Sequence, residues 1–445
     1  MNHSFQTLEF TQILDKLEAY AYTKSAKEEV RQLKPYLSKR EVEHAQKETT
    51  EARIIIDSFG EPPIVSLHNV NELVINAAQG TCLSAEQLEY LGITFTAVKR
   101  MKDFLSRCKI LEIGLPYYET ELNALEQLRE ELSQKIRGAR VDDYASKLLK
   151  DLRNTIERLD DKMRAKAELI LKNSKAYLSD SFVTIRNGRL CVPVKKEYKF
   201  QIAGSVIDKS STGMTVFIEP AAVAKISEEL QIVKIDADNE ERRILYELTD
   251  LVAKEREVIE HNQRTLEKID FLFAKGKLSA QCEGKQPQIN NQRHISIKRG
   301  RHPLMAKEIC VPLDFEIGKE ASGIIITGPN TGGKTVAIKT VGLHSLMAQS
   351  GLHVPCEEGD FCMNNQVLCD IGDGQNIAEN LSTFSSHIMN TLDILKIANE
   401  DTLVIMDELG SGTDPTEGMG IAIAILEELR KSKALFLVTT HYPEV

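Results

Sequence analysis

The segment Gly328 to Thr335, GPNTGGKT, combines glycines, a lysine and a hydroxyl residue at the spacing of a phosphate-binding loop. It follows the apolar run Ile324 to Thr327 and precedes the helix-compatible segment Val336 to Lys339, so the order strand, glycine loop, helix is met. Glycines let backbone N–H groups turn toward phosphate oxygens at the positive end of the following helix. We therefore expect ATP to be bound by Gly328, Pro329, Asn330, Thr331, Gly332, Gly333, Lys334 and Thr335.

Lys334 and Thr335 have different expected roles. Lys334 is expected to reach the β- and γ-phosphates, and Thr335 to give its hydroxyl to Mg²⁺. The alternative is a glycine turn followed by Lys-Thr by chance. The full pattern stands between a strand and a helix, and that context favours a phosphate loop.

Two further apolar runs end in residues that could act on ATP. Leu403 to Met406 precedes Asp407 and Glu408, and Leu435 to Val438 precedes Thr439-Thr440-His441. Such runs are typical of buried parallel strands, whose carboxyl ends carry ligand sites in α/β sheets. We expect Asp407 to hold Mg²⁺ through water and Glu408 to polarise the attacking water. An isolated Asp-Glu pair could instead cap the next helix, so this prediction depends on the glycine loop.

Taken in order, these motifs resemble the ATPase domain of the MutS family. They are GPNTGGKT, ENLSTFSSHI (Glu379 to Ile388), LVIMDELGSGTDP (Leu403 to Pro415) and TTHYPE (Thr439 to Glu444). MutS proper usually reads GPNMGGKST. This chain has Thr331 in place of that methionine and lacks the extra serine, which favours the bacterial type 2 paralogues of the family.

The resemblance implies further roles. Ser382, Thr383 and Phe384 would contact the ATP of the opposite subunit in a homodimer, and His441 would be the switch histidine that responds to the γ-phosphate. Domains of this family continue beyond the TTHYPE motif with a dimerising segment, and full paralogues add a Smr nuclease-like domain. We therefore expect a C-terminally truncated chain that dimerises weakly, with endonuclease activity only in the full-length protein.

Composition indicates a multi-domain globular protein, because 445 residues are 42% hydrophobic and 27% charged. No apolar stretch approaches the ~20 residues that span a bilayer, and the N-terminus lacks a signal pattern, so we expect a cytoplasmic protein without a membrane partner. The net charge of −10 argues against a uniformly basic nucleic-acid binder. Any contact with a phosphate backbone must come from a local patch.

The first two thirds of the chain are predicted to be mainly helical. Residues 1–115 are expected to form a helical core, 116–182 long lever helices, and 221–285 a returning lever helix. A heptad seam supports the lever, and no Pro or Gly interrupts the chain from Ala221 to Lys275. The alternative is two ordinary bundle helices. The seam consists of Ala145, Leu149, Leu152, Ile156, Leu159 and Met163.

Residues 183–220 are predicted to form a small β-rich insert at the end of the lever. Asn187-Gly188 is a hairpin turn signal, and a second candidate hairpin runs from Ser205 to Ile218. Six basic residues against two acidic ones lie between Arg186 and Lys209, at the place of the DNA-gripping clamp in MutS relatives. The alternative is a solvated sheet face. The expected nucleic-acid contacts are Arg186, Arg189, Lys195, Lys196 and Lys199.

The predicted fold is therefore multi-domain, with a mainly α-helical core and lever, a small β-rich clamp insert and an α/β P-loop ATPase domain of the ABC type over residues 286–445. The resemblance implies an ATP-dependent clamp on nucleic-acid assemblies. Its targets would be branched or double-stranded DNA, where it suppresses recombination, or the rRNA of collided ribosomes, which it splits.

The alternative function is that of a structural ATPase of the chromosome-maintenance class. In that class, a coiled coil separates the phosphate loop from the Asp-Glu strand. Here Lys334 and Asp407 are only 73 positions apart, which favours the clamp.

Overall fold

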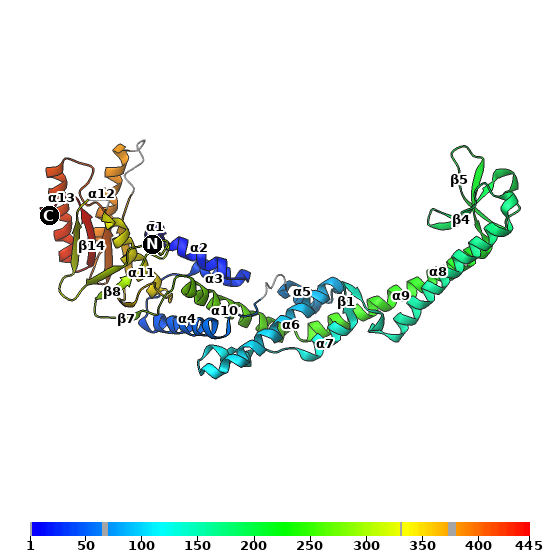
Figure 1. Ribbon diagram of the computed structural model, residues 1–445, viewed down its shortest axis with the longest axis horizontal. Helices are drawn as coiled ribbons and strands as arrows, with labels where there is room; N and C mark the ends of the chain where they lie inside the picture. The colour runs from blue at the N-terminus through cyan, green and yellow to red at the C-terminus, as the bar shows by residue number, and fades with distance from the viewer. Residues whose placement is uncertain (1, 65–69, 330–331, 373–379) are drawn as a thin grey trace. The chain divides into compact units, whose positions relative to one another are not determined.

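The computed structural model describes residues 2–64, 70–329, 332–372 and 380–445 (Figure 1). The chain folds into two compact units. It is mostly helical with several small sheets, which confirms the mainly helical part of the predicted fold class. The first unit comprises Met1–His68, Ala97–Asn123 and His261–Val445, and the second comprises Asn69–Thr96 and Ala124–Glu260.

The first unit begins with short amphipathic helices. Leu8, Ile13 and Leu17 are buried, so the apolar stripe of the N-terminal segment belongs to the core. Thr23 caps the third helix by accepting a hydrogen bond from the Ala26 N–H. The helices are α1 Asn2–Thr7, α2 Phe10–Tyr20, α3 Lys24–Gln32, α4 Lys39–Phe59, the second half of α6 Ala85–Cys108, η1 Lys109–Leu111, η2 Leu115–Glu121 and most of α10 Arg256–Gln281.

A parallel four-stranded sheet forms the C-terminal part of this unit, with strand order β10-β14-β13-β12. Its two inner strands are buried along their whole length, as their continuous apolar runs predict. The first strand begins at Gly323. A residue with a Cβ would not fit at this position, because the Cβ would lie 2.0 Å from the Phe436 ring. The elements are β10 Gly323–Thr327, α11 Lys334–Gln349, β12 Gln366–Asp370, α12 Asn380–Ile397, β13 Thr402–Met406, α13 Pro415–Ser432 and β14 Leu435–Thr440.

A second, mixed sheet lies in the same unit, with strand order β7-β11-β8-β9. Strands β7 and β11 are parallel, whereas β8 is antiparallel to both β11 and β9. These strands are β7 Gln288–Asn290, β8 Ile295–Gly300, β9 Leu313–Ile317 and β11 Glu358–Cys362.

The N-terminal helices pack on α11. Gln46 on α4 donates to the carbonyls of Ala348 at 2.7 Å and Leu352 at 2.9 Å, and Lys339 on α11 pairs with Glu9 at 3.0 Å. Residues 1–68 therefore share a compact unit with 261–445. Contacts between residues about 300 positions apart decide this arrangement.

The second unit is built on two long antiparallel helices, α8 and α9. Leu159 of α8 packs with Ile226 and Leu230 of α9, while Ser146 at the start of α8 bonds Glu240 farther along α9 at 2.7 Å. The remaining elements precede and connect them. The elements are α5 Val70–Ala78, the first half of α6, α7 Glu126–Lys135, β1 Ile136–Arg137, β2 Arg140–Val141, η3 Asp143–Ala145, α8 Lys147–Asn173, η4 Lys175–Tyr177 and α9 Ala221–Lys254.

Both long helices are shorter than the sequence suggested. A turn with Gly138 at φ 61° and Ala139 at φ 56° separates α7 from the start of α8. The returning element ends at Lys254, and Glu255 (φ −91°, ψ 12°) precedes α10. At 1.5 Å per residue, α9 is about 50 Å long instead of the ~80 Å expected of an unbroken helix to Lys275.

A four-stranded antiparallel sheet connects α8 to α9, in the order β3-β4-β6-β5 (Figure 1). Both predicted hairpins are confirmed, and the first turns at Asn187 (φ 50°) and Gly188 (φ 74°). One face of the sheet buries Val192, Val194 and Ile218 against the end of α8. The elements are β3 Thr184–Arg186, β4 Arg189–Lys195, η5 Lys196–Tyr198, β5 Gly204–Lys209 and β6 Thr215–Pro220.

Among the described residues, no helix combines the length and the apolar character needed to cross a membrane.

Candidate functional site

The glycine loop lies between the end of β10 and the start of α11. Gly333 precedes the helix with φ 77°, and Gly328 has φ 137°, so both occupy the region that favours glycine. Apart from its chain neighbours, a Cβ at Gly328, Gly332 or Gly333 would meet no atom of a described residue within 4 Å. The loop backbone therefore borders open space that a phosphate group could fill. Asn330 and Thr331 of the predicted site lie outside the described residues.

Lys334 is the first residue of α11, and its side chain is buried. Its ammonium group donates a hydrogen bond to the Gly328 carbonyl at the other end of the loop. The charge predicted to bind phosphate thus lies against the loop that would hold it.

Thr335 and Asp407 meet where the glycine loop approaches the end of β13. The Thr335 hydroxyl donates to Asp407 Oδ2 at 2.7 Å, and the Thr439 hydroxyl donates to Asp407 Oδ1. Strand β14, which carries Thr439, lies between β10 and β13 in the sheet. The parallel order of the strands therefore brings three separate segments to one carboxylate.

Glu408 follows with a left-handed backbone, φ 50°. Its N–H donates to the Thr439 hydroxyl at 2.8 Å, and the neighbouring Asp407 N–H donates to the Asp370 carbonyl at 2.9 Å. Bonds from both adjacent strands therefore hold the backbone of this turn. His441 Nε2 lies 3.5 Å from Glu408 Oε1, so the two predicted catalytic residues are neighbours.

A polar cluster that was not predicted from the sequence lies beside this turn. Asp370, the last residue of β12, lies 3.0 Å from His387 Nδ1, accepts from Asn390 at 2.8 Å and accepts from Thr391 at 3.2 Å. The hydrogen bond to Asp370 raises the pKa of His387, and the charges of Asp370 and Glu408 act in the same direction. A usable signal was present, because Asp370 ends the short apolar run Val367 to Cys369, as Asp407 ends its own.

The predicted trans signature, Ser382, Thr383 and Phe384, lies on α12, on the same helix as His387. The placement of these three side chains lies outside what the structure describes.

The residues present fit ATP with Mg²⁺. Mg²⁺ is usually held by one or two carboxylates together with water and substrate phosphates, and Thr335 and Asp407 supply a hydroxyl and a carboxylate beside the open glycine loop. Within the described ranges, no group of three or more His, Cys, Asp or Glu side chains is arranged to hold a metal ion. The donor set therefore suits a metal whose remaining ligands come from nucleotide and water.

On the β-rich insert, Arg186 and Arg189 are directly paired across β3 and β4. Arg186 lies 3.9 Å from Asp208 and 4.3 Å from the centre of the Phe217 ring, and Arg189 pairs with Glu219 at 2.6 Å. Both guanidinium groups thus already have acidic partners. Lys195, Lys196 and Lys199 are exposed and form no ion pair with any described residue.

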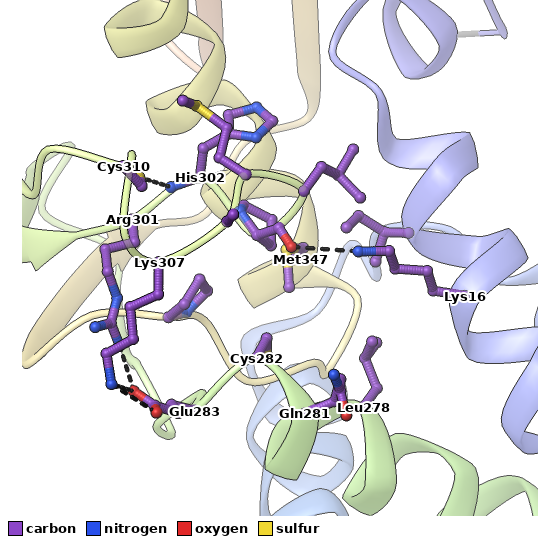
Figure 2. A pocket seen from close by; sticks show the side chains of 16 residues that line it. Lys16, Leu278, Gln281, Cys282, Glu283, Arg301, His302, Lys307, Cys310 and Met347 are labelled. Carbon is purple, nitrogen blue, oxygen red and sulfur yellow. Dashed lines mark hydrogen bonds and ion pairs between the residues drawn. The ribbon is translucent and has the colours of Figure 1, made fainter.

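A separate cavity of about 430 Å³ lies beside α2, the end of α10 and the segment Arg301 to Cys310 (Figure 2). None of the predicted ATP-binding residues within the described ranges lines it. Arg301 and Lys307 converge on Glu283, at 2.8 and 2.7 Å, while Lys16 reaches the Pro303 carbonyl at 3.5 Å (Figure 2). Two of its cations are therefore already paired, and the cavity is a poorer phosphate site than the glycine loop.

Comparison with known proteins finds similar sequences over the ATP-site motifs and over the rest of the chain. Residues 324–445 match the family model described as MutS domain V. A protein named endonuclease MutS2 from Lachnoclostridium phytofermentans is 39% identical over 459 aligned residues, which cover 99% of this chain and 57% of that protein. Proteins of the same name from Clostridioides difficile and Clostridium perfringens are 38% and 40% identical, and the alignments cover 99% of this chain and 57% and 56% of theirs.

The chain thus spans about 57% of the length of the curated relatives that it matches. The similarity extends along almost the whole chain, including the helical and β-rich parts that precede the glycine loop. Residues 324–445 therefore match MutS domain V, and the chain is similar along almost its whole length to proteins named endonuclease MutS2.

Proposed function

We propose that this chain binds and hydrolyses ATP with Mg²⁺ as the motor of a clamp on nucleic acid. The observation that carries the proposal is the hydrogen bond of 2.7 Å from Thr335 to Asp407, formed beside a glycine loop whose backbone faces open space. This arrangement combines a phosphate cradle with the hydroxyl and carboxylate that suit Mg²⁺.

Each residue of the site has a proposed part. Thr335 and Asp407 would hold Mg²⁺, which would supply positive charge to the β- and γ-phosphates. Lys334 exchanges its bond with the Gly328 carbonyl for a phosphate oxygen. Glu408, whose backbone N–H donates to the Thr439 hydroxyl, orients the attacking water and accepts its proton. His441, 3.5 Å from Glu408, responds to the presence of the terminal phosphate.

The rest of the chain is proposed to couple ATP binding and hydrolysis to the clamp. Residues 286–445 form the ATPase domain, residues 1–115 a helical core, 116–182 and 221–285 the lever, and 183–220 the clamp. The clamp contacts branched or double-stranded DNA, or rRNA on the ribosome, through Arg186, Arg189, Lys195, Lys196 and Lys199. A second copy of the chain supplies Ser382, Thr383 and Phe384 to the ATP site. We propose that it acts in the cytoplasm.

The relatives are named endonucleases, and they are longer than this chain. We propose no nuclease residue here.

The test is nucleotide binding by the purified chain, measured with a fluorescent ATP analogue in Mg²⁺ and in EDTA. Wild type should bind more tightly in Mg²⁺, and Lys334→Ala should weaken binding about tenfold or more, because a hydrogen bond to a charged group is lost. Lys339→Ala is the matched control, since this lysine lies on the same helix and pairs with Glu9 at 3.0 Å. Binding that is indifferent to both Mg²⁺ and Lys334 would contradict the proposal.

A further inference from the structure

A group of exposed aromatic and basic side chains lies on the β-rich insert, apart from the paired arginines. Phe200 is 85% exposed, and Lys199 Nζ lies 4.6 Å from the centre of its ring. Single exposed apolar residues are ordinary on protein surfaces, so Phe200 alone carries no argument. The basic and aromatic side chains around Phe200 make it informative. We call this group the basic–aromatic surface. It consists of Lys172, Lys175, Lys196, Tyr198, Lys199 and Phe200.

Local packing joins the two segments of this surface. The Tyr177 and Tyr198 rings lie 5.3 Å apart and tilted by 46°, which connects the segment after α8 to the segment after β4. Main-chain bonds support the same connection, since Ser179 donates to the Pro193 carbonyl at 3.1 Å. The segment that follows α8 is therefore held against the segment that carries Lys196, Lys199 and Phe200.

A hollow of about 540 Å³ lies along the first of these segments. Lys172, Lys175 and Phe182 line it, together with the buried Leu171 and Leu178 and the exposed Asp180. Phe182 is 59% exposed. Within the described ranges no ion pair is found for Lys172, Lys175, Lys196 or Lys199, so these ammonium groups are available to an external anion.

We propose that the basic–aromatic surface binds single-stranded nucleic acid by stacking unpaired bases on Phe200 and Tyr198 while the lysines contact the phosphates. Aromatic rings beside cations on a positively charged groove are the features that bind single strands without sequence preference. A duplex hides the faces of its bases and would use only the lysines. This inference rests on the proposed nucleic-acid function and deepens it, because it names the unpaired strand as the preferred ligand.

The two arginines of the β-rich insert differ from these lysines in their charge environment. Arg186 and Arg189 are already paired with Asp208 and Glu219, so their net charge is largely compensated. The uncompensated charge lies on lysines next to aromatic rings instead. The two sets can be separated by mutation.

The test uses the whole chain and measures fluorescence anisotropy with a 20-nucleotide oligo-dT, the same length of oligo-rU, and a 20-base-pair DNA duplex. Phe200→Ala should weaken binding of the single strands about fivefold to a hundredfold and leave the duplex almost unchanged. Phe200→Trp should restore single-strand binding. The two oligonucleotides distinguish DNA from RNA as the preferred source of the strand.

Tyr144→Ala is the matched control, because Tyr144 is 78% exposed with Lys150 Nζ 4.4 Å from its ring centre, in the same unit but outside this surface. It should leave all three affinities unchanged. Replacement of Lys196 and Lys199 by Ala should reduce the slope of log affinity against log salt for the single strands.

The outcomes separate the two proposals. If Phe200→Ala has no effect while replacing the five predicted contact residues by Ala weakens binding, the clamp stands and base stacking is wrong. Equal losses for single strand and duplex also overturn stacking. If no nucleic acid binds to wild type, the proposed function itself fails. If Phe200→Ala abolishes only the capture of a protein, the surface is a protein-binding site and the inference is overturned.

Discussion

Thr335 donates a hydrogen bond of 2.7 Å to Asp407, and this bond joins the start of α11 to the turn after β13. Because Thr439 also donates to Asp407, the carboxylate keeps one protein partner when Thr335 is replaced. A variant that lacks the Thr335 hydroxyl should therefore keep the fold of this turn, so its effect on Mg²⁺-dependent nucleotide binding can be measured separately.

Thr335→Ala is expected to weaken Mg²⁺-dependent nucleotide binding about ten- to a hundredfold, because a metal-site hydroxyl is lost. Thr335→Ser should keep most of the affinity, since it retains the hydroxyl. Titration of Mg²⁺ at fixed nucleotide concentration measures the effect. Equal Mg²⁺ requirements in wild type and Thr335→Ala would remove Thr335 from the proposed metal site.

Glu408→Gln is expected to retain ATP binding and to slow hydrolysis about a hundredfold or more, because the general base is lost while the phosphate contacts remain. Single-turnover hydrolysis with enzyme in excess measures the chemical step. Glu417→Gln is the control, since Glu417 is an exposed acid on α13 that accepts from Thr413 at 3.2 Å. Hydrolysis at the wild-type rate by Glu408→Gln would show that another group activates the water.

His387 is expected to stabilise the fold in a pH-dependent way through Asp370. The pKa of His387 is raised by this contact, so its stabilising effect is fully present below the ordinary value of 6.5 and is lost as pH rises through the raised pKa. The melting temperature of His387→Gln should therefore fall furthest below wild type under mildly acidic conditions. The difference should shrink at alkaline pH.

Thermal unfolding monitored by circular dichroism from pH 5.5 to 9 tests this prediction. His44→Gln, which removes an exposed histidine on α4, serves as the control. A difference between wild type and His387→Gln that stays constant across this range would show that His387 acts through packing and not through its charge.

Lys275 on α10 is expected to destabilise the protein near neutral pH. It is buried, and its ammonium group lies 3.5 Å from the Ala45 carbonyl and 5.0 Å from the Phe271 ring centre. Burial lowers the pKa of Lys275 from 10.5 to about 8, while the charges of Glu48 and Glu29 oppose this change. This difference in the pKa of Lys275 corresponds to a loss of unfolding free energy on the order of 3 kcal/mol.

The sign of the effect follows from proton binding. Between pH 8 and 10.5 the unfolded chain binds the Lys275 proton and the folded chain releases it, so stability should rise with pH in this range. Lys275→Met should be more stable than wild type at pH 7 and should lack this rise. Chemical unfolding at pH 7, 8.5 and 10 measures it, with exposed Lys24→Met as the control. A parallel pH dependence in wild type and Lys275→Met would contradict the assignment.

Short-range signals in the sequence predicted several elements correctly. The turn at Asn187-Gly188 was predictable because both residues tolerate positive φ, and the buried strands β13 and β14 were predictable from their continuous apolar runs. The interruption after Lys254 was not, because no Pro or Gly marks it. Local propensity describes each segment but does not say which segments meet.

For the candidate site, the sequence determined which groups could bind phosphate, from the spacing of glycines with Lys334 and Thr335. Only the tertiary structure decided that Thr335 and Thr439 converge on Asp407, that Asp370 holds His387, and that Arg186 and Arg189 are matched by Asp208 and Glu219. These relations depend on the order of strands in a sheet and on the register of a hairpin. Strand order and hairpin register are set by packing between residues that are distant in the chain. A single sequence does not show which distant residues pack together.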